Sequence, residues 1–271
     1  MQIKGFDIVG GLRWRLRRLA RRWFILSRYR NWRQAIAAVE SGLPCSHLYT
    51  RDGHTIVHPS KPGLVETALE IWHDRVYSVP GMVLADGSVV IDAGANVGLL
   101  TLWISRTSPL SEVHAFEPDE ENFACLQRNV SNWGCHRAIL HREALGGLAR
   151  LARFARSSTR SLDGRLLDDE CDSSERTCEV VVRGVNELLK SFGERGIALF
   201  KIDIEGGEHE LFEAVDSCLL GRVGAFAIEY HDNIVPGTLD LIERRLRSTH
   251  RLQVVPSAHG YGTVFAVRRQ S

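Results

Sequence analysis

Short apolar runs that predict β-strands recur along most of the chain, and the first of them is Val89, Val90 and Ile91. An acidic residue and two glycines follow this run, and an apolar-periodic segment then predicts a helix from Asn96 to about Ser105. The pattern is that of a strand, a turn and a helix. Further strands are predicted at residues 112–117, 138–142, 148–154, 178–182, 197–202, 225–228, 252–255 and 262–267.

The turn after the first strand has the features of a ligand-binding loop. Gly94 and Gly98 lack Cβ atoms, so backbone N–H groups there can approach a polar ligand closely. Asp92 opposes a phosphate at this position, and the glycine spacing differs from the dinucleotide-binding fingerprint. Glu117 closes the second strand 25 positions after Asp92, where a carboxylate can accept hydrogen bonds from both hydroxyls of a ribose.

Two later strands also lead into ionisable residues. Asp203 follows the run at residues 197–202, and His231 lies just after the run at residues 225–228. Because open α/β sheets bind ligands at the carboxyl ends of their strands, we expect these side chains to lie beside a ligand. Glu205 and Glu208 are predicted to open the next helix, where carboxylates stabilise the helix N-terminus.

Four motifs at predicted strand ends resemble those of the FkbM family of S-adenosylmethionine-dependent O-methyltransferases: residues 90–98, 115–118, 200–208 and 228–231. The resemblance implies a Rossmann-like class I methyltransferase fold. This is an α/β domain with a seven-stranded, mostly parallel sheet, an antiparallel last strand and helices on both faces. It also implies S-adenosyl-L-methionine as cofactor. The implied acceptor is a hydroxyl group on a sugar, a polyketide or another specialised metabolite, and a lipid-linked one if the protein meets a membrane.

The resemblance also indicates which residues bind the cofactor. The expected set is Asp92, Gly94, Ala95, Asn96, Gly98, Glu117, Pro118, Glu143, Ala144 and Asp203. Glu143 or the backbone of Ala144 is expected beside the adenine. The chain departs from the family at residues 183–186, which read Arg-Gly-Val-Asn where many members have Thr-Thr-Leu-Asp. The role of that acidic position is therefore open.

Methyl transfer to a hydroxyl needs a group that accepts the hydroxyl proton. His231 is our first choice, because imidazole titrates near neutral pH, and Glu205 is the second. The alternative for His231 is that it only orients the substrate or packs in the pocket. Our main hypothesis includes no metal, but carboxylates and imidazole suit a hard divalent ion. A metal site would be built from Asp203, Glu205, Glu208 and His231.

Two segments are expected to cover the pocket. Residues 41–87 contain three turn signals, which predict small hairpin-like elements, and an apolar face that predicts a helix at residues 64–77. Tyr77 is expected either beside the cofactor or in the core or rim. Residues 155–177 are polar and lack periodicity, which predicts a mobile substrate lid.

The N-terminal segment differs in charge from the rest of the chain. Residues 1–40 carry a net charge of +8, and the remaining residues carry −7. Apolar residues at steps of three and four from Leu12 to Leu26 predict a basic amphipathic helix within residues 11–33. Such a helix could pack over the catalytic domain, lie on an anionic membrane or follow nucleic-acid phosphates. Without an RNA-binding signature elsewhere, we expect no nucleic-acid partner.

These observations divide the chain into a helical extension (1–40), a lead-in or lid segment (41–87) and a cofactor-binding domain (88–271). No apolar run reaches the ~18 residues needed to span a bilayer. The six cysteines include no Cys-x-x-Cys pair, which predicts reduced thiols. We therefore expect a cytoplasmic protein, peripheral at the inner face of the membrane if the helix binds lipid. The sequence does not indicate the oligomeric state.

Two other function classes remain open at this stage. A nicotinamide-dependent oxidoreductase would use a similar topology, although the glycine spacing disfavours it. A non-catalytic, methyltransferase-like scaffold could dock to a membrane through its basic helix. The intact set of strand-end motifs favours an enzyme over such a scaffold.

Overall fold

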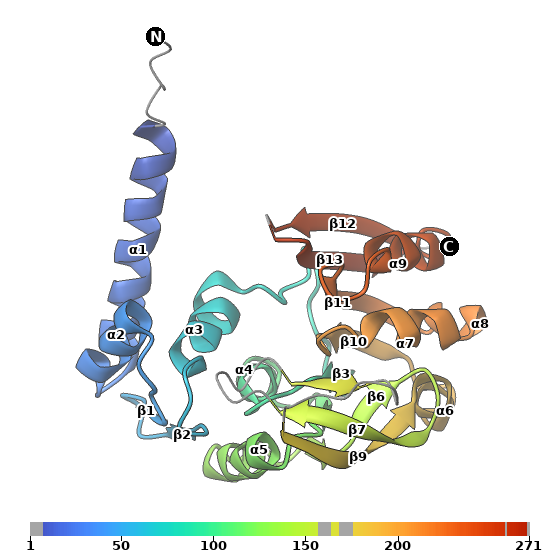
Figure 1. Cartoon of the computed structure of the whole chain (residues 1–271), viewed down its shortest axis with the longest axis horizontal. Coiled ribbons are helices and arrows are strands. Elements are labelled where there is room, and N and C mark those ends of the chain that lie inside the picture. The colour runs from blue at the N-terminus through green and yellow to red at the C-terminus, as the bar shows by residue number, and fades with distance from the viewer. Residues whose placement is uncertain (1–7, 157–163, 168–175, 258, 270–271) are drawn as a thin grey trace.

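A seven-stranded sheet forms the centre of the computed structural model, which describes residues 8–156, 164–167, 176–257 and 259–269. The spatial strand order is β12, β13, β11, β10, β3, β4, β5 (Figure 1). The strands are β3 (Val89–Ala93), β4 (Glu112–Phe116), β5 (Ala138–His141), β10 (Ile197–Ile202), β11 (Val223–His231), β12 (His250–Pro256) and β13 (Tyr261–Arg268). All neighbours from β5 to β11 are parallel, and β13 is antiparallel to both β11 and β12. The predicted sheet is confirmed.

Helices cover both faces of this sheet. On one face lie α4 (Leu99–Thr107) and α5 (Glu120–Asn132), and on the other lie α6 (Val185–Ser191), α7 (Glu208–Ala214), α8 (Ser217–Leu220) and α9 (Thr238–Leu246). The side chains of β3 alternate between two hydrophobic clusters, with Val90 in one and Val89 and Ile91 in the other. Burial on both faces explains why this strand reads as a continuous apolar run. The class I methyltransferase fold expected from the sequence is thus confirmed.

A second, four-stranded sheet lies beside the first. Its order is β6 (Ala144–Gly146), β9 (Arg176–Gly184), β7 (Arg150–Arg156) and β8 (Arg165–Leu167). The strands expected at residues 148–154 and 178–182 are present as β7 and β9. In contrast, β8 forms within the stretch expected to be a loop, since it pairs with β7. The serine-rich part of the expected lid lies outside the described residues.

The lead-in segment contains the expected hairpin and a shorter helical stretch than expected. β1 (His47–Tyr49) pairs with β2 (Thr55–Val57) in antiparallel fashion. α3 (Leu64–Ala68) continues as a π-helix, η1 (Leu69–Asp74). The helix ends there because Arg75 adopts a left-handed backbone conformation, with φ of 57°. Tyr77 therefore lies in the chain that leaves the helix.

The N-terminal segment forms two helices, α1 (Ile8–Arg28) and α2 (Trp32–Ser41), so the basic helix expected within residues 11–33 is present as α1 and ends at Arg28. Contacts with β1 and the following turn cause the break. Tyr29 is fully buried and forms a β-bridge with Thr50. The Asn31 side chain donates to the carbonyl of His47 at 2.9 Å and accepts from the Tyr49 N–H at 3.0 Å. Periodicity could not reveal these tertiary bonds.

The three predicted segments share one core. Ile25 of α1, Ile36 of α2 and Leu69 of η1 belong to the same hydrophobic cluster as Leu102 of α4. The division of the chain at residues 40 and 87 stays a prediction. Packing nevertheless joins the N-terminal segments directly to the helix that follows the first ligand-binding loop.

Gly94 is required where the loops after β3 and β10 meet. Its φ is +72°, and a Cβ atom added to it would lie 1.8 Å from the backbone oxygen of Asp203. The Gly94 N–H donates to the carbonyl of Phe116 at 3.0 Å. The glycine therefore permits close packing of two strand-end loops, in addition to any role in binding a ligand.

We expect Gly94→Ala to lower the free energy of unfolding by at least about 3 kcal/mol, because a left-handed backbone and overpacking both oppose the side chain. Gly87→Ala is the matched control, since its φ is +76° and nothing lies within 4 Å of the added Cβ. That variant should lose only about 1–2 kcal/mol. Denaturant unfolding measures both values, and equal losses would contradict the packing role of Gly94.

Candidate active site

The main pocket opens at the carboxyl ends of β3, β4 and β10. It also receives residues from the lead-in segment and the second sheet. The lining residues are Lys61, Thr67, Ile71, Tyr77, Asp92, Gly94, Ala95, Asn96, Val97, Leu99, Leu100, Phe116, Glu117, Pro118, Asp119, Asn122, Ala144, Leu145, Phe154, Arg156, Gly164, Leu166, Lys201, Asp203, Ile204 and Glu205. Of the expected cofactor-binding residues, Gly98 and Glu143 do not line it, and the others do.

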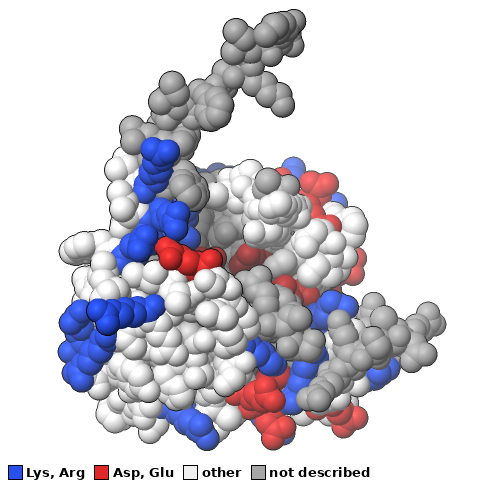
Figure 2. Space-filling view, turned by 60° about the vertical axis from the view of Figure 1, so that its left-hand side comes forward, with Lys and Arg blue, Asp and Glu red and all other residues white. Residues whose placement is uncertain are grey.

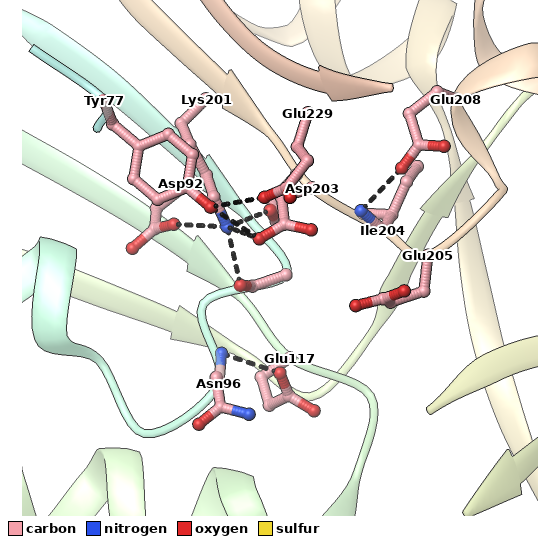
Figure 3. A network of polar contacts seen from close by, with 12 residues as sticks. Tyr77, Asp92, Asn96, Glu117, Lys201, Asp203, Ile204, Glu205, Glu208 and Glu229 are labelled. Atoms are coloured by element: carbon pink, nitrogen blue, oxygen red, sulfur yellow. Dashed lines mark hydrogen bonds and ion pairs between the residues drawn. The ribbon is translucent and has the colours of Figure 1, made fainter. Parts of the chain in front are cut away.

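A buried ammonium group stands at the centre of the site. Lys201 Nζ donates to the carbonyls of Ala93 (2.9 Å) and Gly94 (2.8 Å), and it forms ion pairs with Asp92 (3.6 Å) and Asp203 (3.5 Å; Figure 3). Burial opposes its charged form, but the neighbouring carboxylates outweigh burial and raise the pKa of Lys201. Lys201 therefore fixes the loop after β3 against the end of β10.

Asp92 is also held from the other side. It is completely buried, and its Oδ2 accepts a hydrogen bond of 2.8 Å from the Thr101 hydroxyl on α4. A buried carboxylate requires such partners. Asp92 therefore orders the strand, the turn and the helix around one side chain.

Tyr77 connects the lead-in segment to two strand ends. Its hydroxyl lies 2.8 Å from Asp203 and 3.1 Å from Glu229, the latter on β11 (Figure 3). The hydroxyl has one proton, so it donates to one carboxylate at a time. Burial and the charge of Asp203 raise the pKa of Glu229 to about 7, which allows a protonated Glu229 to donate to Tyr77.

Glu117 connects the ends of β3 and β4. One carboxylate oxygen accepts from the backbone N–H of Asn96 at 2.8 Å, and the other accepts from that of Asp119 at 2.9 Å. Burial outweighs these hydrogen bonds and raises the pKa of Glu117 to about 7. Asn96 has a φ of 51°, a conformation that is rare outside glycine. The loop is thus held in a fixed shape at the pocket wall.

His231 lies between two glutamates behind the pocket wall. Its Nδ1 is 3.3 Å from Glu208, and its Nε2 is 3.5 Å from Glu205. Burial favours a neutral imidazole, but the hydrogen bond and charge of Glu208 and the charge of Glu205 outweigh it. They raise the pKa of His231 from its ordinary 6.5 to about 9. At neutral pH His231 is therefore an imidazolium.

Glu205 is the residue of this cluster that lines the pocket. The sequence predicts that Glu205 opens the next helix, but α7 begins at Glu208, so Glu205 lies in the preceding turn. Its φ is 51°. Glu208 explains this turn, because its fully buried carboxylate accepts the backbone N–H groups of Ile204 (2.9 Å) and Gly206 (3.0 Å). Burial and nearby carboxylates, Asp203 first, raise the pKa of Glu205 to about 8.

Glu143 and Asn186 both have partners within the protein. Glu143 forms a two-pronged ion pair with Arg183, at 2.5 and 2.9 Å, and does not line the pocket. Ala144, the alternative expected beside the adenine, does line it. Asn186, at the position where the family often has Asp, donates to the carbonyl of Ala214 and accepts from the N–H of Asp216. That position therefore has a structural role in this chain.

Several residues of the site were missed from the sequence. Lys201 and Glu229 sit within the motifs at the ends of β10 and β11, so a charged residue in an apolar run was their signal. Ile71 and Phe154 line the pocket from elements distant in sequence, and their apolar character gave no signal. Only the folded chain brings them together with the strand ends.

The structure brings together three of the four residues that the alternative hypothesis gives as metal ligands. Single ligand atoms of Asp203, Glu205 and His231 lie within 4.8 Å of one another. Glu208 is not in this group, and its oxygens accept backbone N–H groups instead. Both ring nitrogens of His231 already face carboxylates, so an ion would have to displace these contacts.

Comparison with known proteins identifies the family. The model of the methyltransferase FkbM domain matches residues 92–248. The 31-O-demethyl-FK506 methyltransferase FkbM of Streptomyces tacrolimicus is 30% identical over 230 residues, which cover 75% of this chain and 87% of that protein. The AMB antimetabolite synthetase AmbE of Pseudomonas aeruginosa is 27% identical over 198 residues, but the match spans only 9% of that synthetase.

Among solved structures, an rRNA methylase from Streptococcus thermophilus has a TM-score of 0.46 and 15% identity, and covers 75% of this chain and 97% of its own. The fold assignment rests on the strand order described above. The family model covers more than half of this chain, and the relative from Streptomyces tacrolimicus is matched over most of its length. The chain therefore belongs to the FkbM family of methyltransferases.

Proposed function

We propose that this chain transfers a methyl group from S-adenosyl-L-methionine to a hydroxyl oxygen of a sugar, a polyketide or another specialised metabolite. The observation that carries the proposal is Glu205, a carboxylate with a raised pKa on the wall of a strand-end pocket. The relative from Streptomyces tacrolimicus is named as a 31-O-demethyl-FK506 methyltransferase, which supports an oxygen acceptor. Family membership disfavours the nicotinamide alternative.

The charges around the pocket fit a cationic cofactor. Among the described residues, the contacts of Lys201, Tyr77 and His231 include five carboxyl groups: Asp92, Asp203, Glu205, Glu208 and Glu229. The cationic groups in these contacts are Lys201 and His231. When bound, S-adenosyl-L-methionine supplies an activated methyl group on a positively charged sulfonium. The excess of carboxyl groups favours that charge.

The residues that would hold the cofactor follow from the loops at the strand ends. Glu117 would accept hydrogen bonds from ribose hydroxyls, and the backbone of Ala95, Asn96 and Ala144 would contact polar groups of the ligand. Asp92, Gly94, Gly98 and Pro118 would shape these loops, with Asp203 at the end of β10. Glu143 would not touch the cofactor, and its ion pair with Arg183 would hold the chain before Ala144 in place.

Glu205 is the better proton acceptor of the two catalytic residues that we expected. It lines the pocket, whereas His231 lies behind it and is already protonated at neutral pH. A positive ligand beside Glu205 favours its ionised form, and the raised pKa makes it a stronger base than an ordinary carboxylate. In this mechanism His231 positions Glu205 and balances its charge. The proton of the acceptor hydroxyl moves to a Glu205 carboxylate oxygen.

Calorimetry with S-adenosyl-L-methionine and S-adenosylhomocysteine tests the cofactor. We expect both to bind, and the affinity to fall by up to about tenfold per pH unit below pH 7, because protonated Glu117 accepts ribose hydroxyls less well. Glu117→Gln should bind more weakly and with a smaller dependence on pH than the wild type, because the Glu117 contribution is lost. If neither ligand binds the wild type at any pH, the proposed function is wrong.

Glu205→Gln should reduce methyl transfer by about 10²–10⁴-fold at saturating cofactor, because it removes the proton acceptor. It should weaken cofactor binding far less, because the other four carboxyl groups remain. Release of S-adenosylhomocysteine, with a panel of hydroxylated metabolites as acceptors, measures the rate. In the wild type kcat/KM should rise with pH toward about 8. The matched control is Glu213→Gln, an exposed glutamate that also lies 3.5 Å from a histidine. Loss of activity on addition of EDTA would favour the metal alternative.

His231 should titrate with a pKa near 9 in an NMR experiment on the ligand-free protein, with its signal assigned through His231→Asn. The folded-state pKa exceeds the ordinary value, so the contribution to stability is complete below pH 6.5 and is lost as the pH rises through 9. Glu205→Gln should lower this pKa, and Glu213→Gln should not change it. A value near 6.5 would contradict the positioning role.

A further inference from the structure

Helix α1 presents an apolar stripe to solvent. Leu16, Leu19, Trp23 and Leu26 are 57%, 63%, 70% and 38% exposed. They follow one another at steps of three, four and three residues, so they lie on one face of the helix. A tryptophan and three leucines on one exposed face are unusual for a helix that belongs to a packed domain.

The opposite face of α1 attaches the helix to the domain. Ile25, two residues and therefore about 200° from Trp23, is 1% exposed. Arg17 and Arg21 pair with Asp74 of η1, and the Arg51 side chain donates to the carbonyl of Leu26. These contacts hold the helix so that its apolar stripe faces outward. Figure 1 shows α1 projecting from the rest of the chain.

Exposed arginines flank the apolar stripe. Arg15, Arg18 and Arg22 of α1 are exposed, and Arg18 and Arg22 lie near Glu40 of α2. Residues 1–40 contain ten basic residues against Asp7 and Glu40. Figure 2 shows basic side chains gathered on this part of the molecule. The surface therefore combines positive charge with a narrow apolar stripe.

We propose that α1 docks this protein in the plane of an anionic lipid surface, with Leu16, Leu19, Trp23 and Leu26 inserted and the flanking arginines at the phosphate groups. Tryptophan is favoured at the boundary between headgroups and acyl chains, and arginine next to anionic headgroups. Among the described residues no helix combines the length and apolar character required to cross a bilayer. The helix accordingly lies on the membrane.

The charge pattern favours lipid over the other occupants of this face. Two copies of α1 packed through their stripes would bring rows of arginines together, and like charges repel. Nucleic acid would use the arginines but would leave the exposed tryptophan and leucines in water. An anionic bilayer can pair with the arginines through its phosphate groups and bury the apolar stripe among its acyl chains. This proposal is independent of the reaction proposed above.

Sedimentation of the full chain with vesicles tests the proposal. Vesicles of phosphatidylcholine and phosphatidylglycerol in equal amounts should bind the protein, and vesicles of phosphatidylcholine alone should not. Binding should weaken as the salt concentration rises. Leu19→Glu should reduce the partition coefficient at least about tenfold, because it places a carboxylate in the inserted stripe. The matched control is Leu148→Glu, which makes the same change at a side chain of similar exposure, 69%, outside α1. It should bind like the wild type.

Two further measurements test whether Leu19→Glu is folded and whether α1 contacts a second copy of the chain. Circular dichroism of Leu19→Glu should match the wild type, which excludes loss of folding as the cause. Light scattering should give the same mass for wild type and variant without lipid. A dimeric wild type that Leu19→Glu converts to a monomer would overturn the proposal in favour of a second copy. Equal binding of wild type and Leu19→Glu to anionic vesicles would overturn it in favour of charge alone.

Discussion

The buried ammonium of Lys201 is the interaction on which the rest of the site depends. A buried charge is costly unless it is paired, and here two carboxylates and two backbone carbonyls surround it. The carbonyls belong to the turn after β3, and Asp203 belongs to the end of β10. Removal of the ammonium would leave the carboxylates of Asp92 and Asp203 without this shared cation, so Lys201 holds the two strand ends in one relative position. The same pairing places Asp203 where it meets the Tyr77 hydroxyl.

The sequence predicted those parts of the protein that a local pattern reveals: an apolar run that forms a strand, and a charged residue within that run or at its end. Val89–Ala93 is apolar because both faces of the strand are buried, and Asp92 and Glu117 are conspicuous because they interrupt or close such runs. Asp119 stands directly before α5 and caps it through the N–H groups of Glu121 and Asn122, the arrangement that a carboxylate before a helical pattern indicates. Most of the expected cofactor-binding residues consequently line one pocket.

The features that could not be predicted depend on partners distant in sequence. Glu143 follows a strand in the expected way, but Arg183, on a neighbouring strand of the second sheet, draws it into an ion pair. Glu205 is a better candidate for the proton acceptor than His231 for two reasons. Glu205 lines the pocket, and the carboxylates around the His231 imidazole raise its pKa. The helix break at Tyr29 depends on β1. Local pattern contains no information about such tertiary partners.

The part of the pocket wall built by the lead-in segment has a consequence for redesign. Lys61, Thr67, Ile71 and Tyr77 line the pocket, yet all four precede the region that the family model matches. Two members of the family can therefore share their strand-end loops and differ in this wall. The loops after β3 and β10 pack closely at Gly94 and leave no room for a side chain there, whereas η1 is a six-residue helical stretch outside the central sheet. If the chain methylates a hydroxyl acceptor as proposed, residues 61–77 are the segment to exchange between relatives to change that acceptor.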